Sequence, residues 1–552
     1  MNAPAGLPPE MSSMVLQTLR QVVGRELTDH RIMEMDEQDT FPTELIQKLV
    51  SPDVGLHLIF LPEDCGGLAG GARDICRISE EMAAWDLGVA TAFLAICLGT
   101  DPILVGGTPA QKQKWLVRIA NEGLIVAYGV TEPEAGSNVA SLKTTADQIV
   151  DAAGNVTGYR LNGAKQFITN GGVADLYTIL AKTPGGPSFF AVEKGTPGLS
   201  VGKKEEKHGI RASNTTGVLL EDVEVPAENL IGGVEGQGLK QANAVFGYTR
   251  LMVGAFGLGG GQAPLKRALA YGKTREQFGA PLVEKEGYLL KLIVEPWIDL
   301  AAGRAYMEQT ALRIDEGHTE LTTEGSIAKL WCTEAGNRAA DAAIQAHGGY
   351  GYAREYVVEK MRRDVRITTI YEGTSEIQQS IISMFRWKET VRSKGAFYAL
   401  LASALDELAA DKPRAGAALM ASTVRALNET VLRMHAAKMT RSQMVMFTFA
   451  DMMTIAEVGA AFVAQSVRGP VEGGLSPEAT LAMSRAFARK AARVVRQGTE
   501  LCAGCLLSEP GEEAARAGAE LLDTVQKLLP LDATRGLWED MNIVGAALKA
   551  LD

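Results

Sequence analysis

Apolar and polar positions follow different periods along the chain, and the changes of period divide it into four segments. The first segment has apolar residues at helical spacing, with a clear helix start at Thr108-Pro109-Ala110-Gln111, where Thr caps and Gln closes a capping box. The second switches to short β-branched and aromatic runs broken by Gly, Asn and Pro, which is typical of strands. Helical patterns then return and continue past a weak boundary near Lys394-Gly395. The predicted order is helical (1–123), mostly strands (124–236), helical (237–390) and helical again (391–552).

The composition is that of an ordinary globular protein, and the net charge argues against one class of partner. The 552 residues are 46 % hydrophobic and 22 % charged, with 55 basic and 66 acidic residues and a net charge of −11. Such a surface repels a phosphate backbone, so we expect no nucleic-acid partner. The longest apolar run, residues 87–99, is shorter than the roughly 17–25 residues of a spanning helix. With no signal-peptide pattern at the N-terminus, the chain is expected to be cytoplasmic, with its six cysteines reduced.

Four short segments concentrate glycine, hydroxyl and carboxylate residues. Their backbone N–H groups and hydroxyls suit a polar or phosphate-bearing ligand, and glycine allows close backbone approach. Each segment also has a plain structural interpretation: a turn, an aromatic residue packed in a sheet, a helix end or a capped helix start. In the second segment the two-residue period places the ring of Phe167 and the hydroxyl of Thr169 on one face. The segments are residues 128–138, 165–172, 345–351 and 370–378.

Taken in order, the motifs resemble the acyl-CoA dehydrogenase family, flavoproteins that desaturate the Cα–Cβ bond of acyl-CoA thioesters. The resemblance covers about residues 15–390 and implies an α+β fold: an N-terminal helical domain, a middle β-barrel and a four-helix bundle, followed here by an additional C-terminal helical domain. The motifs at family-like spacing are Val-Thr-Glu-Pro-Glu-Ala-Gly-Ser (130–137), Phe-Ile-Thr-Asn-Gly (167–171), Glu-Asp-Val-Glu-Val-Pro (221–226), Arg-Glu-Gln-Phe-Gly (275–279) and Tyr-Glu-Gly-Thr-Ser-Glu-Ile-Gln (371–378).

The resemblance implies an FAD cofactor and an acyl-CoA substrate. Phe167, which stands where Trp is more usual, corresponds with Thr169 to the pair beside the flavin ring. Arg275 belongs to a clamp on the FAD pyrophosphate and adenosine that is supplied across a dimer interface, and Arg250 corresponds to an arginine of the acyl-CoA site. The implied cofactor-binding residues are Tyr128, Val130, Thr131, Ser137, Phe167, Thr169, Arg275, Gln277, Phe278, Gln345, Gly348, Gly349, Thr374 and Glu376, and the implied substrate-binding residues are Ser137, Arg250 and Gly373.

Glu372 sits where most of the family places the base that removes the α-proton. Some members hold the base beside the position of Arg250 instead, but the neighbour here is Thr249, which cannot serve. The chemistry needs a carboxylate in a dry pocket, where loss of hydration raises its pKa. Hydrogen bonds to the thioester carbonyl stabilise the enolate-like transition state. The resemblance implies that one donor is the backbone N–H of Glu372 and the other a flavin hydroxyl.

The resemblance further implies a homodimer that passes electrons to an electron-transfer flavoprotein. Two other functions stay open on the same scaffold: a flavoprotein oxidase with an Asp base and no CoA contacts, and a DNA-associated stress protein with a basic C-terminal surface. Glu372 and Arg250 argue against the oxidase. Residues 391–552 hold 18 Lys and Arg against 18 Asp and Glu, which argues against the DNA-associated protein.

The C-terminal extension contains a long amphipathic pattern that begins at Ser476-Pro477. Its apolar face is expected to dock on the core, and the extension is expected to leave a dimer rather than a tetramer. The arginines of the other face are interpreted as a solvated surface or as a peripheral contact with an anionic membrane. The apolar face carries Met483, Phe487 and Val494, and the other face carries Arg485, Arg489, Arg493 and Arg496.

Two further features are interpreted without new chemistry. No metal site is predicted, because His347 has no second His or Cys cluster at metal spacing, and Cys502 and Cys505 lie in a helical pattern as buried thiols. Ala90 and Leu94 fall, by the resemblance, at the floor of the acyl pocket. An apolar floor of this kind would admit a longer acyl tail.

Overall fold

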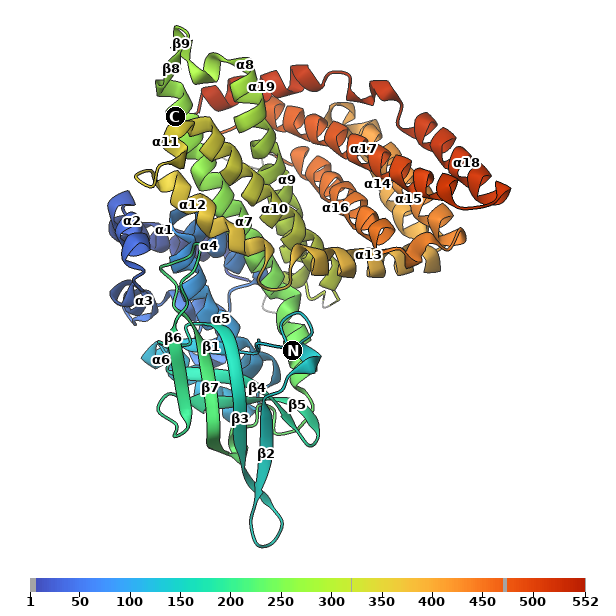
Figure 1. Ribbon diagram of the computed structural model, residues 1–552. Helices are drawn as coiled ribbons and strands as arrows, with labels where there is room; N and C mark the ends of the chain where they lie inside the picture. Colours follow the sequence, from blue (N-terminus) through green and yellow to red (C-terminus); the bar gives the residue numbers. More distant parts are fainter. Residues whose placement is uncertain (1–5, 319, 470–473, 552) are drawn as a thin grey trace. The chain divides into compact units, whose positions relative to one another are not determined.

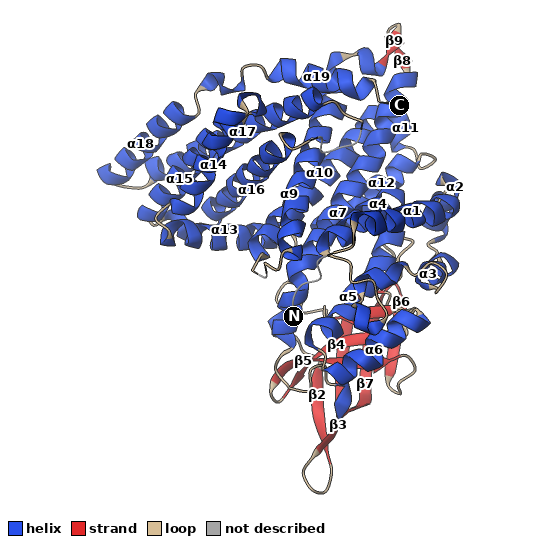
Figure 2. Cartoon of the chain, turned by 180° about the vertical axis from the view of Figure 1, so that it is seen from behind, coloured by secondary structure: helices blue, strands red, loops and turns tan. Residues whose placement is uncertain are grey.

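The chain folds into two compact units, each of which is described by itself. The computed structural model describes residues 6–318, 320–469 and 474–551. The first unit comprises residues 1–260 with 311–320 and 363–367, and the second comprises residues 261–310, 321–362 and 368–552. The α+β class is confirmed: helices, one large sheet and two further sets of helices follow one another along the chain (Figure 2).

Most helices of the first unit precede its sheet in sequence, and one long helix follows it. The predicted capping box is present: the N–H of Gln111 donates to the Thr108 hydroxyl, and the Gln111 side chain accepts from the N–H of Thr108. The first helix after the sheet, α7, continues into the second unit. The helices are α1 (Pro9–Glu26), α2 (Asp29–Gln38), α3 (Thr43–Val50), α4 (Ala72–Trp85), α5 (Leu87–Gly106), α6 (Pro109–Glu122) and α7 (Gly238–Thr274).

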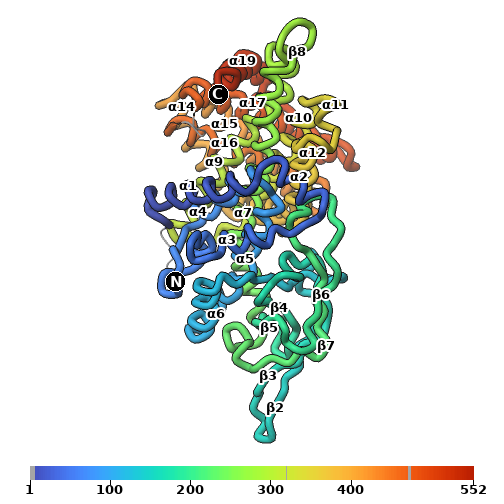
Figure 3. Tube along the Cα trace, turned by 90° about the vertical axis from the view of Figure 1, so that its left-hand side faces the viewer, coloured from blue at the N-terminus to red at the C-terminus, as the bar shows by residue number. Residues whose placement is uncertain are grey.

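The sheet has seven strands in the order β1-β4-β2-β3-β7-β6, with β5 paired to β4. The pairs of β4 with β1 and β2 are parallel and the other pairs are antiparallel. The β2–β3 hairpin projects beyond the other strands (Figure 3). The strands are β1 (Val126–Gly129), β2 (Thr145–Val150), β3 (Val156–Thr169), β4 (Leu176–Thr183), β5 (Gly186–Glu193), β6 (Leu199–Lys204) and β7 (Thr215–Pro226).

Helix α5 packs directly on this sheet and holds β1 in place. A Cβ added at Gly99 would lie 2.9 Å from the backbone of Val126, so only glycine permits this approach. The hydroxyl of Thr178 donates to the carbonyl of Gly99 at 2.8 Å. β1 is thereby fixed, and with it the start of the loop that follows its last residue.

Among the described residues, two helices, α5 and α16 (Gln443–Ser466), are long and apolar enough to cross a membrane by length and composition. In each, 78 % of the most apolar window is buried inside the protein, which is the pattern of a core helix. α5 is longer than the apolar run that the sequence shows, because Asp101 interrupts the run but is buried against Tyr248. Composition alone therefore does not make either helix a membrane span.

The second unit contains the rest of α7, a small hairpin and all later helices. Helices α7 and α10 approach closely at two glycines, where a Cβ on Gly261 would lie 2.5 Å from the Cα of Gly336. The elements are β8 (Glu276–Gln277), β9 (Ala280–Pro281), α8 (Glu286–Tyr288), the π-helical turn η6 (Leu289–Val294), α9 (Glu295–Asp315), α10 (Thr322–His347), α11 (Gly349–Tyr352), α12 (Val357–Val365), α13 (Ser375–Arg392), α14 (Ala396–Asp411), α15 (Ala417–Ala436), α16, α17 (Pro477–Ser508), α18 (Glu512–Leu528) and α19 (Leu537–Lys549).

The C-terminal extension, α14–α19, packs against the helices of the same unit (Figure 1). Phe487 of α17 is buried and meets Trp331 of α10 edge-on, with ring centroids 5.3 Å apart. At the same junction the guanidinium of Arg386 binds the Glu457 carboxylate at 2.8 and 3.0 Å, and both side chains are 7 % exposed. The predicted docking of the apolar face is confirmed for Met483 and Phe487, whereas Val494 is only half-buried.

The arginine stripe of α17 is not the open surface that the sequence suggested. Arg485 and Arg489 both bind Asp540 of α19, and their side chains are only 17 % and 16 % exposed. Arg496 donates to the carbonyl of Leu529 at 2.7 Å and pairs with Glu500. Only Arg493 is exposed. The interpretation as a solvated or membrane-binding face is therefore wrong for Arg485, Arg489 and Arg496, because the segments that follow α17 cover them. It holds for the exposure of Arg493 alone.

Candidate active site

In the first unit, the loop after β1 and the end of β3 lie against each other. The N–H of Gln166 donates to the carbonyl of Thr131 at 2.9 Å. Tyr128 stacks on Phe189 with ring centroids 5.7 Å apart, and Val130 is buried. This contact brings the predicted flavin-loop residues beside the strand that carries Phe167 and Thr169.

A buried ion pair fixes this contact. The Lys165 ammonium binds the Glu132 carboxylate at 2.7 Å, with side chains 0 % and 3 % exposed, and also donates to the carbonyl of Val130 at 3.3 Å. Glu132 accepts from the backbone N–H groups of Lys143 and Thr144 as well. Burial lowers the pKa of Lys165 to about 8, and the hydrogen bond to Glu132 opposes that shift. The pair therefore fixes the loop from inside the protein.

A β-bulge in β3 presents Phe167 to solvent. Between Lys165 and Ile168 the register against β7 shifts, which inserts one extra residue in β3. Phe167 has a positive φ of 58° and is 64 % exposed, while Ile168 is buried. The next outward residue, Thr169, is half-buried. An exposed ring beside a hydroxyl on a fixed strand end can stack on a planar ligand and donate to its edge.

The rest of the loop is open. Ser137 and Asn138 are exposed, and the Asn138 amide donates to the hydroxyl of Ser141 at 2.6 Å. A Cβ at Gly136 would meet no atom within 4 Å. The loop therefore leaves space for a ligand at the position where the sequence predicts contact with both cofactor and substrate.

Helix α7 carries Arg250 and, close by in sequence, a tyrosine that belongs to a polar cluster inside the first unit. Thr249 is fully buried and Arg250 half-buried. Two residues before Arg250, Tyr248 donates to Asp101 of α5, and its hydroxyl lies 3.3 Å from the sulfur of Cys97. Ala90 and Leu94, on the same face of α5, are fully buried. The α5 face that the sequence assigns to the acyl-pocket floor thus continues into a polar cluster.

In the second unit, Glu372 lies in a left-handed turn that precedes α13. Glu372 has φ 54° and Gly373 has φ 85°. The Thr374 hydroxyl then caps α13 by accepting from the N–H of Ile377 at 3.4 Å. Glu372 is half-buried and Glu376 exposed. The predicted base therefore sits on a short, strained turn that is anchored by a helix start.

Two side chains that the sequence analysis missed hold this turn. The Lys329 ammonium, fully buried, donates to the carbonyl of Gly373 at 2.6 Å. The Gln378 amide, also fully buried, donates to the carbonyls of Glu372 at 3.0 Å and Gly373 at 3.1 Å. A Cβ on Gly373 would lie 2.7 Å from the Gln378 nitrogen, so glycine is needed there. The sequence feature that could have identified Lys329 is its position as a single charged residue among the small and apolar residues of 325–332.

The predicted FAD clamp forms a second group in the same unit. β8 and β9 form a hairpin whose two turn residues, Phe278 and Gly279, have φ 51° and 74°. Phe278 is 96 % exposed at its tip. Beside the hairpin, the Arg275 guanidinium lies over the Tyr350 ring, 5.9 Å from its centroid. Gln277 and Gln345 are exposed.

The turn between α10 and α11 completes this group. A Cβ at Gly348 or Gly349 would meet no atom within 4 Å, so the backbone there is open to a ligand. His347, just before it, is buried, stacks on Tyr271 at 4.6 Å and bonds through its ring nitrogen to the carbonyl of Ala343 at 2.8 Å. Within the described residues, no group of three or more His, Cys, Asp or Glu could hold a metal ion.

The structure therefore gathers the predicted residues into three groups. Tyr128, Val130, Thr131, Phe167 and Thr169 meet in the first unit. The turn of Glu372, Gly373 and Thr374 and the clamp that joins Arg275 to the 345–349 turn both belong to the second unit. Arg250 lies on α7 in the first unit.

Comparison with known proteins agrees with these motifs. Residues 9–123, 127–223 and 236–385 match family models described as the N-terminal, middle and C-terminal domains of acyl-CoA dehydrogenase. A short-chain-specific acyl-CoA dehydrogenase of Megasphaera elsdenii is 38 % identical over 356 residues, 63 % of this chain and 90 % of the relative. The chain belongs to the acyl-CoA dehydrogenase family.

Two further similarities are to a subunit of a larger complex and to a solved structure that covers the C-terminal extension. A subunit of the caffeyl-CoA reductase–Etf complex of Acetobacterium woodii is 35 % identical over 381 residues, 68 % of this chain and 97 % of that protein. The crystal structure of an acyl-CoA dehydrogenase from Bacillus anthracis complexed with FAD is 24 % identical, with a TM-score of 0.83 over 100 % of this chain and 98 % of that one. The C-terminal extension therefore belongs to a fold that is already known.

Proposed function

We propose that the protein converts an acyl-CoA thioester to the trans-2-enoyl-CoA, with FAD as cofactor and Glu372 as the base that removes the α-proton. The observation that carries the proposal is that buried side chains fix the backbone of the turn at Glu372 by hydrogen bonds. Lys329 and Gln378 fix the carbonyls of Glu372 and Gly373, so the backbone that carries the Glu372 side chain and N–H is held in one conformation. A base and an oxyanion donor on one residue suit proton removal next to a carbonyl.

The described residues fit FAD in both units. The exposed ring of Phe167 offers a stacking face, and the hydroxyls of Thr131 and Thr169 can bond to the edge of a flavin ring. Arg275 offers charge-assisted hydrogen bonds to a pyrophosphate, and the open backbone at Gly348 and Gly349 allows close approach. When bound, FAD accepts the hydride that leaves the β-carbon.

The residues of this chain supply the rest of the reaction. Arg250 and Ser137 bind the acyl-CoA and orient its thioester. The Glu372 carboxylate accepts the α-proton while its N–H donates to the thioester oxygen, which stabilises the negative charge that develops there. Loss of the α-proton and of the β-hydride leaves the Cα=Cβ double bond of the product.

We also infer a cytoplasmic homodimer that delivers electrons to an electron-transfer flavoprotein. A 96 %-exposed phenylalanine at the tip of a hairpin, Phe278, supports insertion into a second copy beside Arg275. The similarity to a subunit of an Etf complex supports the acceptor.

Replacing Glu372 by glutamine tests the proposal. An amide cannot accept the α-proton, so turnover should fall by about 10²–10⁴-fold or more while FAD content stays at one per chain. Anaerobic titration with acyl-CoAs of increasing length should bleach the flavin of the wild type and not of the variant. Near-wild-type turnover in E372Q would refute Glu372 as the base, and rapid peroxide formation in air would favour an oxidase.

A further inference from the structure

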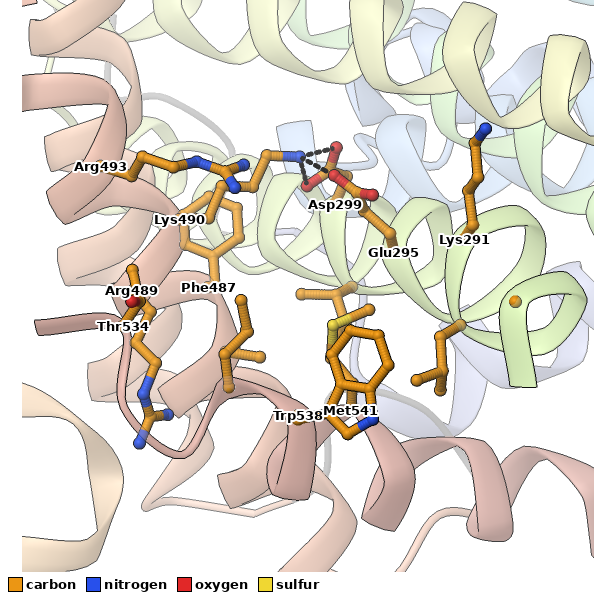
Figure 4. A pocket seen from close by; sticks show the side chains of 15 residues that line it. Lys291, Glu295, Asp299, Phe487, Arg489, Lys490, Arg493, Thr534, Trp538 and Met541 are labelled. Carbon is orange, nitrogen blue, oxygen red and sulfur yellow. Dashed lines mark hydrogen bonds and ion pairs between the residues drawn. The ribbon is translucent and has the colours of Figure 1, made fainter. Parts of the chain in front are cut away.

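A pocket of about 260 Å³ lies where the C-terminal extension meets the preceding helices of the second unit. One wall is the π-helical turn η6 with the start of α9, the second is α17, and the third is α19 (Figure 4). Single π-turns in helices are frequent at functional sites. None of the residues assigned to FAD or acyl-CoA lines this pocket.

The floor of the pocket is apolar and aromatic. Phe487, Trp538 and Met541 line it together with Leu290, Ile298 and Leu537. Trp538 is 60 % exposed although its ring nitrogen is bound to Glu286 at 2.6 Å. An indole held in one orientation with an open face favours an apolar ligand.

Some of the charged side chains that line the pocket have ion-pair partners and others have none among the described residues. Lys490 binds Asp299 at 2.7 and 2.8 Å and Glu295 at 3.4 Å, and Arg489 is taken by Asp540. Arg493 and Lys291 have no ion-pair or hydrogen-bond partner anywhere in the described part of the chain. With Arg489 bound to Asp540, the other charged residues of the lining are three cations and two carboxylates, a net of one positive charge. Arg493 and Lys291 are both exposed.

Figure 4 shows how these groups are arranged around the pocket. The charged ends of Arg493, Lys490 and Lys291 lie on one side, and Trp538 and Met541 lie on the opposite side. The guanidinium of Arg489 points away from the pocket. A ligand that fits this arrangement has an apolar body and one anionic end.

We propose that this junction pocket binds a short amphipathic carboxylate. The planar guanidinium of Arg493 suits the two oxygens of a carboxylate, and Lys291 adds attraction at the mouth. The acids Glu295 and Asp299 on the same side disfavour a dianion such as a phosphate monoester. At ~30 Å³ for each water-sized group, the volume holds roughly nine of them, which matches a straight-chain acid of about six to eight carbons.

The test is titration of the holoenzyme with octanoate, followed by calorimetry and by tryptophan fluorescence. We expect saturable binding that changes the emission of Trp538 and leaves the flavin spectrum unaltered. Octanol supplies the tail without the charge and acetate the charge without the tail, so both should bind at least about tenfold more weakly. Octanol binding as tightly as octanoate would overturn the proposal, as would the absence of any saturable binding.

Three variants locate the site. Arg493→Gln should weaken octanoate binding about tenfold or more, because a charge-assisted hydrogen bond is lost. Arg516→Gln, on the exposed face of α18, is the matched control and should bind like the wild type. Gly287→Leu adds an apolar side chain at a position that lines the pocket and where a Cβ meets no atom within 4 Å, so it should weaken binding by occupying part of the space. Unchanged affinity in R493Q and G287L would place octanoate elsewhere and refute the proposal.

Discussion

The ammonium of Lys329 on α10 donates to the carbonyl of Gly373 at 2.6 Å, from a side chain that is fully buried. The hydrogen bond ties the proposed base turn to a helix 44 positions away in the sequence. Lys329 does not itself carry the proposed chemistry. It positions the peptide that does.

Replacing Lys329 by methionine should therefore damage catalysis more than binding. Loss of one hydrogen bond from a charged donor is worth ~1.5–3 kcal/mol, which corresponds to a fall of about 10- to 100-fold in kcat. KM and FAD content should change little. Lys527→Met on exposed α18 is the control. Steady-state kinetics with flavin quantitation decide the point, and equal losses of FAD and kcat would indicate a purely structural role.

The buried pair of Lys165 and Glu132 makes a second prediction, about stability. Lys165→Met leaves a carboxylate buried without its cation, which should cost about 3–5 kcal/mol in the free energy of unfolding. The double variant K165M/E132L removes both charges and should be more stable than K165M. Denaturant unfolding of the three proteins measures this, and a double variant no better than K165M would contradict the pairing.

These two lysines show where sequence patterns stop being informative. Capping and periodicity are local, so the helix starts at Thr108 and Ser476 and the change from helices to strands near residue 124 were predictable. A hydrogen bond between residues 33 or 44 positions apart leaves no such pattern. The bulge that exposes Phe167 is also set by pairing with β7 and not by its own sequence.

The remaining site residues were predicted from the resemblance to the family. Local patterns could not predict which surfaces other parts of the chain cover. Periodicity identified one face of α17 as charged, yet it could not reveal that Asp540, 55 positions after Arg485, would cover that face. Whether a polar face meets water or protein depends on elements far away in the chain.

The proposed clamp predicts how FAD is lost. Arg275→Ala removes a charge-assisted hydrogen bond to phosphate, so flavin should dissociate on dilution at concentrations where the wild type stays loaded. Arg392→Ala, an exposed arginine outside the clamp, should retain its FAD. Absorbance of the filtrate after ultrafiltration measures the free flavin. Full retention in R275A would remove Arg275 from the cofactor site.

His347 predicts a dependence of stability on pH. Burial, followed by the charge of Arg267, lowers its pKa from the ordinary value of 6.5, and the hydrogen bond to Ala343 only partly compensates. As pH falls through 6.5, the unfolded chain takes up a proton that the folded ring resists, so the free energy of unfolding decreases. Buried His57 acts with the same sign.

Calorimetry between about pH 5.5 and about pH 7.5 checks the sign. Tm should be lower at the acidic end, and His347→Gln should reduce the difference. His30→Gln, at an exposed position, should leave it unchanged. A pH dependence that is the same in H347Q and the wild type would show that the ring is not a contributor.

Asp540 holds α19 onto α17, because it is the shared partner of Arg485 and Arg489 and is itself 5 % exposed. Asp540→Ala leaves two largely covered arginines without their carboxylate, so we expect a loss of about 3 kcal/mol in stability. α19 also carries Trp538, whose emission should shift to the red as the helix loosens. Asp523→Ala breaks only a surface pair with Lys527 and should change stability by less than about 0.5 kcal/mol. If D540A and D523A have the same free energy of unfolding and the same tryptophan emission, the ion pairs of Asp540 with the two arginines do not hold α19 in place.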